Sequence, residues 1–178
     1  MQKLSREKFV GLVTVGGAST LVGAGIAVAE ARPLDRSFKR DREPQVELSF
    51  PAGWFVRDQL IENLRSPQQV LVLSNVSLPS DPNPDEGALP DLSALGDADI
   101  LLMVLAEPLI PDTQHARRLP GARIVLDDFQ ARDDSYPSVR WWHQWFEGAR
   151  FVYTVGLWAG YRADEASARA VVESLRLP

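Results

Sequence analysis

The chain has 178 residues, and its 24 acidic side chains outnumber 19 basic ones to give a net charge of −5. This acidic balance disfavours nucleic acid and anionic membrane surfaces as partners, because both attract basic patches. The lack of cysteine excludes disulfide bonds, thiolate metal sites, a cysteine nucleophile and a lipid-modified N-terminal cysteine.

The first 29 residues have the features of an export signal. The first eight residues carry three basic side chains, Lys3, Arg6 and Lys8. An uncharged apolar stretch follows over residues 9–29 and ends in the small-residue sequence Ala27-Val28-Ala29. This order predicts a signal peptide cleaved after Ala29. An uncleaved membrane anchor is the alternative, since about twenty apolar residues can span a bilayer. We therefore expect an extracytoplasmic protein that touches the membrane only through residues 9–29, and only if they are retained.

Residues 30–44 are charged, bounded by prolines and poor in large apolar side chains, which predicts a flexible tether. A single domain is expected over residues 45–178, which are numerous enough to bury a core. Alternation of apolar and polar side chains over residues 45–50 predicts a half-buried strand. A turn at 51–53 and a second short strand at 54–56 are expected to follow.

The middle of the chain predicts two strands separated by a long loop. Residues 70–73 and 100–105 are continuous aliphatic runs, which are typical of strands buried on both faces. Between them, residues 77–90 hold four prolines and three acids, so a surface loop is expected there. Residues 124–126 fit either a short strand or the first turn of a helix, and the pattern leaves both open.

Residues 139–155 predict a β-hairpin with aromatic side chains on both faces of its first strand. One face is expected to carry Val139, Trp141, His143 and Trp145, and the other Arg140, Trp142, Gln144 and Phe146. The turn is expected at 147–149 and the returning strand at 151–155.

A helix is expected to end the chain. Asp164 is a suitable N-cap, and Glu165 suits the positive end of the helix dipole. The apolar stripe that would pack on the sheet consists of Ala168, Val171, Val172 and Leu175.

The order of these elements and three short motifs resemble the PsbP-like domains. The motifs are Phe50-Pro51-Ala52-Gly53-Trp54 after a strand, a late hairpin carrying Tyr153, and a terminal helix ending in Val172-Glu173-Ser174-Leu175. The resemblance covers residues 45–178 and implies an α+β fold, with a curved antiparallel sheet packed against helices. With the N-terminal signal or anchor helix, this is the expected fold class. The resemblance also implies an accessory or binding role, but it assigns no site residue to this chain.

The strongest candidate surface is aromatic. Trp141, Trp142 and Trp145 surround His143 on one strand, and they can all be buried only if both faces of the sheet are covered. Trp54 and Trp158 are possible additional members of this group. A large aromatic core is one interpretation. The other is a partly exposed surface or pocket that binds an extracytoplasmic protein or a small apolar ligand.

An enzyme is the second functional hypothesis. It would be an extracytoplasmic hydrolase that uses His143 or the acids Asp127, Asp128, Asp133 and Asp134. Carboxylates this close together could also bind Ca²⁺, but the alternating spacing and turn glycine of a calcium loop are missing. The chain also lacks the G-x-S-x-G motif of a nucleophilic serine. The sequence therefore favours a non-enzymatic binding module that needs no metal or cofactor.

Overall fold

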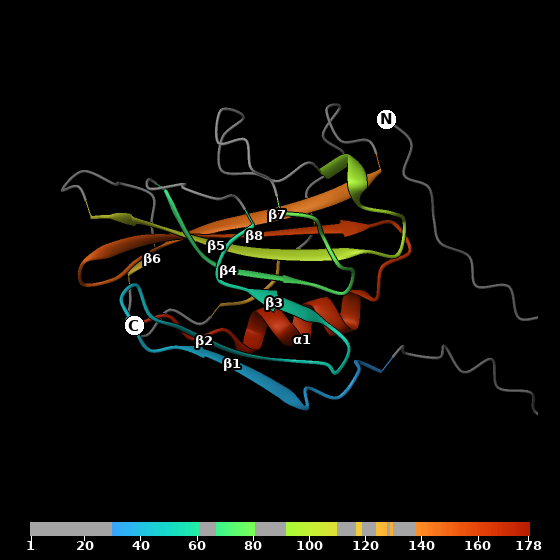
Figure 1. Cartoon of the computed structure of the whole chain (residues 1–178), viewed down its shortest axis with the longest axis horizontal. Coiled ribbons are helices and arrows are strands. Elements are labelled where there is room, and N and C mark those ends of the chain that lie inside the picture. Colours follow the sequence, from blue (N-terminus) through green and yellow to red (C-terminus); the bar gives the residue numbers. More distant parts are fainter. Residues whose placement is uncertain are drawn as a thin grey trace, which may run out of the picture.

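A six-stranded sheet, a two-stranded sheet and one α-helix make up the part of the chain that the computed structural model describes (Figure 1). The described residues are 30–60, 67–80, 92–109, 117–118, 124–127, 129 and 138–178. The expected signal or anchor segment lies outside them, as does most of the expected loop at 77–90. The mostly antiparallel sheets and the helix give the chain an α+β fold.

The six-stranded sheet has the strand order β3-β4-β5-β8-β7-β6. Its strands are β3 (Phe55–Arg57), β4 (Gln68–Ser74), β5 (Ile100–Pro108), β6 (Arg117–Arg118), β7 (Val139–Glu147) and β8 (Phe151–Gly160). All neighbouring strands are antiparallel except β6 and β7, which are parallel. The strands predicted at 54–56, 70–73 and 100–105 are confirmed, and so is the hairpin, which forms β7 and β8.

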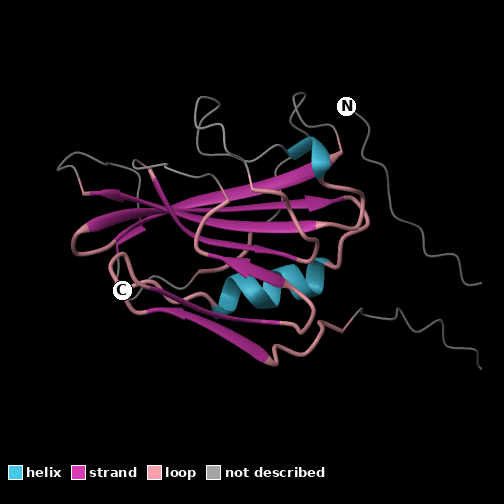
Figure 2. Ribbon diagram, viewed as in Figure 1, coloured by secondary structure: helices cyan, strands magenta, loops and turns pink. Residues whose placement is uncertain are grey.

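The second layer contains α1 (Glu165–Ser174) and the two-stranded sheet of β1 (Arg36–Arg40) and β2 (Val46–Phe50). These elements lie on one face of the six-stranded sheet (Figure 2). Apolar side chains of β2, α1, β4, β5, β7 and β8 share one cluster, which we call the main core. In the described residues, α1 is therefore accompanied on this face by a small sheet rather than by a second α-helix.

The terminal helix follows the sequence prediction. Asp164 caps it: Oδ1 accepts a hydrogen bond from the Ser167 backbone N–H at 3.1 Å, and Oδ2 accepts one from Ser167 Oγ at 2.7 Å. The predicted stripe, which runs from Ala168 to Leu175, is buried in the main core. Among the described residues, no helix combines the length and apolar character needed to cross a membrane.

The flexible tether predicted for residues 30–44 is wrong, because residues 36–40 form β1 and pair with β2. The backbone N–H of Arg32 donates to Ser167 Oγ at 2.9 Å, which also joins this segment to α1. Phe38 packs against the main core, and the buried Arg40 donates from Nη1 to Asp58 Oδ2 at 3.3 Å. The sequence pattern predicted a tether because this segment is rich in charged side chains. Such side chains are also common in edge strands, and β1 is one.

Residues 124–126 are neither a strand nor the start of a helix, so both alternatives left open by the sequence are wrong. Ile124 and Leu126 are nevertheless buried in the main core. The segment is held to α1 by Arg169, whose Nη1 donates to the Leu126 carbonyl. Its apolar pattern therefore reflects burial without regular backbone pairing.

Candidate functional site

The alternation of β7 places its aromatic side chains on two different faces, as predicted. Trp142 and Phe146 are buried in the main core, with exposed fractions of 4% and 0%. Arg140 faces the same way, since its Nη1 donates to Glu165 Oε2 of α1 at 3.2 Å. Trp142 is thus a core residue and does not join the predicted site.

Trp141, His143 and Trp145 lie on the opposite face of the sheet and form a continuous set of rings, which we call the aromatic row. The rings of Trp141 and His143 are stacked, with centroids 4.6 Å apart and planes 13° apart. The ring of Trp145 meets His143 edge-on, at 4.4 Å and 83°. Trp145 is 43% exposed, so the row begins half-buried and ends at the surface.

Trp158 of β8 extends this surface. It pairs with Trp141 across the strands, and its six-membered ring lies over Gly156, which pairs with His143. A Cβ atom at position 156 would lie 2.5 Å from Trp158 Cη2, so only glycine leaves room for the ring there. Trp54, in contrast, is buried in the main core and does not join the row.

A second apolar cluster covers the neighbouring part of the same sheet face. Its buried members are Leu60, Val72, Leu78, Leu92, Leu95, Leu101, Met103 and Val139. Leu92 belongs to a 3₁₀ turn, η2 (Leu92–Ala94), which lies against this part of the sheet. Trp158 and Leu105 are partly buried at the border of the cluster. The aromatic row is therefore the continuation of a covered apolar face toward solvent.

The contacts of His143 are those of a packed ring. Burial lowers the pKa of His143 below its usual value, so the imidazole is neutral near pH 7. Its ring contacts are with the two flanking tryptophans, and no carboxylate within the described ranges forms a hydrogen bond or ion pair with it. Within the described residues, His143 therefore lacks the orienting carboxylate that a hydrolase would need.

Of the acidic cluster, Asp127 is described and exposed, whereas Asp128, Asp133 and Asp134 lie outside the described residues. Where side chains are described, no group of three His, Asp or Glu residues could hold a metal ion.

Comparisons of the chain with protein-family models, with curated proteins and with solved structures find no match. The resemblance to the PsbP-like domains stays a prediction. The α+β class does not depend on it, because the strand register and α1 establish that class directly.

Proposed function

We propose that this chain is an exported, non-enzymatic binding module whose aromatic row contacts an extracytoplasmic protein or a small apolar ligand. The observation that carries the proposal is the exposure of Trp145, 43%, at the end of a stacked row. Tryptophan side chains supply large contact areas and are enriched among the residues that dominate binding energies.

The packing of the row suits it to binding. Trp141 and Trp145 are both held against His143, so little side-chain freedom remains to be lost when a partner docks. A neutral His143 also allows a partner to exclude water from the row without burying a charge.

The proposed extracytoplasmic location rests on the sequence of residues 1–29. N-terminal sequencing of the exported protein should begin at Glu30, or the intact chain should remain in the membrane fraction. A soluble cytoplasmic pool that starts at Met1 would contradict the proposed export.

Trp145→Ala is expected to weaken partner binding at least tenfold while the free energy of unfolding falls by only about 1 kcal/mol. The immobilised exported protein would be used to capture partners from membrane extracts, and apolar ligands would be titrated by tryptophan fluorescence. The matched control is Phe55→Ala, which removes an aromatic side chain of similar exposure, 46%, from the far edge strand β3. Equal binding by wild type and Trp145→Ala would show that the row is not the contact surface.

A further inference from the structure

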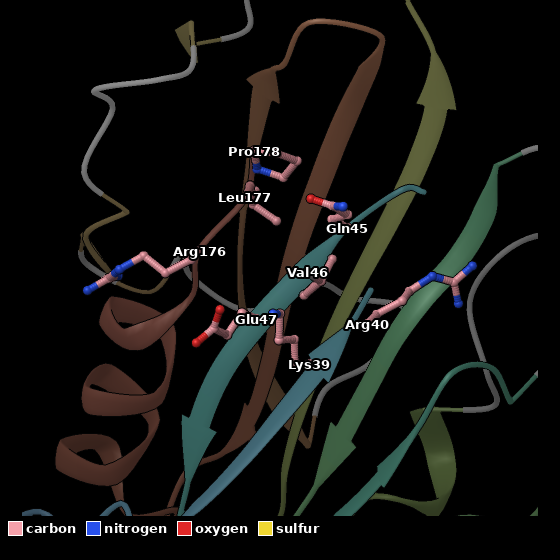
Figure 3. Close-up of a pocket in the computed structure, with 8 residues that line it drawn as sticks. All are labelled: Lys39, Arg40, Gln45, Val46, Glu47, Arg176, Leu177 and Pro178. Atoms are coloured by element: carbon pink, nitrogen blue, oxygen red, sulfur yellow. The ribbon is translucent and has the colours of Figure 1, made fainter. Parts of the chain in front are cut away.

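Three connecting segments meet at the end of the molecule opposite the start of α1 (Figure 1). They are residues 41–45 between β1 and β2, residues 148–150 between β7 and β8, and the terminal residues 176–178. Together with Phe151 and Tyr153 of β8, they line a partly open pocket of about 90 Å³, which we call the end pocket. A second, more open depression of about 190 Å³ shares Gln45 and Pro178 with it (Figure 3).

Tyr153 lines the end pocket from the side of the main core. Its side chain is 1% exposed, and its ring lies 6.3 Å from that of Phe151. None of the described residues forms a hydrogen bond with the Tyr153 hydroxyl. The hydroxyl is not one of the fully enclosed polar atoms that lack a partner, so it meets solvent and is free to donate a hydrogen bond to a ligand.

The protonation of Tyr153 is set by its surroundings. Burial, and then the negative charge of Glu43, raise the pKa of Tyr153 to about 12. A tyrosine hydroxyl is already protonated at neutral pH, and the raised pKa extends this to higher pH, so the group can donate a hydrogen bond to an acceptor in the pocket.

The other polar groups of the end pocket leave it without a strong charge. Arg150 Nη1 donates to Glu43 Oε2 at 2.5 Å, so these two charges offset one another. Gln45 Nε2 donates to the Asp41 carbonyl at 3.2 Å, which leaves the amide oxygen of Gln45 as an acceptor beside the pocket. Phe151 and Pro178 supply apolar walls.

We propose that the end pocket binds an uncharged amide group, as found in a peptide bond or a carboxamide. The ligand carbonyl accepts a hydrogen bond from the Tyr153 hydroxyl, and the ligand N–H donates to Gln45 Oε1. The walls of Phe151 and Pro178 accommodate the apolar substituent. A charged ligand fits less well, because it could pair with Arg150 or Glu43 only by breaking the ion pair between them.

The end pocket is independent of the aromatic row. Tyr153 lies on the sheet face that carries the main core, whereas Trp145 lies on the opposite face. Loss of one binding activity is therefore distinguishable from loss of the other.

The test is an NMR titration of the exported protein with N-methylacetamide, the smallest model of a peptide group. We expect saturable shifts of the Gly148 backbone amide and the Gln45 side-chain amide, with a Kd in the millimolar range for so small a probe. Tyr153→Phe, which removes only the hydroxyl, is expected to weaken binding at least tenfold. Tyr161→Phe is the control, because it removes a hydroxyl from an exposed tyrosine outside the pocket.

The stability of Tyr153→Phe separates ligand binding from a structural role. If the hydroxyl serves a ligand, the free Tyr153→Phe protein should be as stable as wild type, because the hydroxyl makes no hydrogen bond to the described part of the fold. A Tyr153→Phe protein that is less stable than wild type but binds N-methylacetamide with unchanged affinity would mean that the hydroxyl has a structural role only, and would overturn the proposal. Tighter binding of acetate or methylammonium than of N-methylacetamide would overturn it as well.

Discussion

Replacement of Trp142 by alanine is expected to lower the free energy of unfolding by about 3–5 kcal/mol, because it leaves a large cavity in the main core. Trp142 packs in the same cluster as Val171 and Val172 of α1, so its loss also weakens the contact between the two layers. Trp145→Ala on the same strand is expected to lower that free energy by only about 1 kcal/mol, because its ring is 43% exposed and its main aromatic contact is with His143.

Denaturant unfolding of both variants measures this difference, provided that the slope of free energy against denaturant is the same as in wild type. The two substitutions remove the same side chain from the two faces of one strand, so each serves as the control of the other. A loss of several kcal/mol in both variants would mean that both faces are covered core. That result would contradict the proposal that the aromatic row is a binding surface.

The second large effect is expected for Gly160→Ala, which should lower the free energy of unfolding by about 3 kcal/mol. This is the upper end of the range for substitutions that overfill a packed site. A Cβ atom at this position would lie 2.2 Å from the backbone oxygen of Asp97. The two segments cannot easily separate, because Gly160 N–H donates to the Asp99 carbonyl at 2.9 Å and Arg162 N–H donates to the Asp97 carbonyl at 2.7 Å.

Gly156→Ala is the matched control on the same strand. Its Cβ atom would meet the far end of the Trp158 side chain, which can rotate away, so we expect a loss of only about 1 kcal/mol. The displaced Trp158 ring should also weaken binding at the aromatic row. Thermal or denaturant unfolding compares the two variants, and equal losses would show that the Trp158 ring is as immovable as the backbone at Asp97.

Local periodicity was sufficient to predict the hairpin and the terminal helix. The alternation over β7 correctly separated Trp141 and Trp145 from Trp142, but it could not show which set is buried. That outcome depends on which face α1 and β2 cover, and their docking is a long-range property of the fold.

The errors in the sequence-based interpretation have physical causes. The tether prediction included β1 because three of its five side chains are charged. Only Phe38 is a large apolar side chain that packs inward, and the pairing of Arg40 with Asp58 cannot be seen in the sequence. The end pocket could not be predicted at all, since Tyr153 resembles any strand aromatic until residues 41–45 and 176–178 are placed around it.

The attachment of Arg32 to the start of α1 limits how far the domain could stand from a bilayer. Its backbone N–H binds Ser167 Oγ, and its Nε lies 3.7 Å from Asp164 Oδ2. Two residues, Glu30 and Ala31, lie between Ala29 and Arg32, and the three residue steps from Ala29 to Arg32 reach about 10 Å when extended. If residues 9–29 stay in the membrane, the corner between β8 and α1 is held close to the lipid headgroups. The ten residues of β8 span about 33 Å, so the end pocket can lie up to that distance farther from the membrane than the attached corner does.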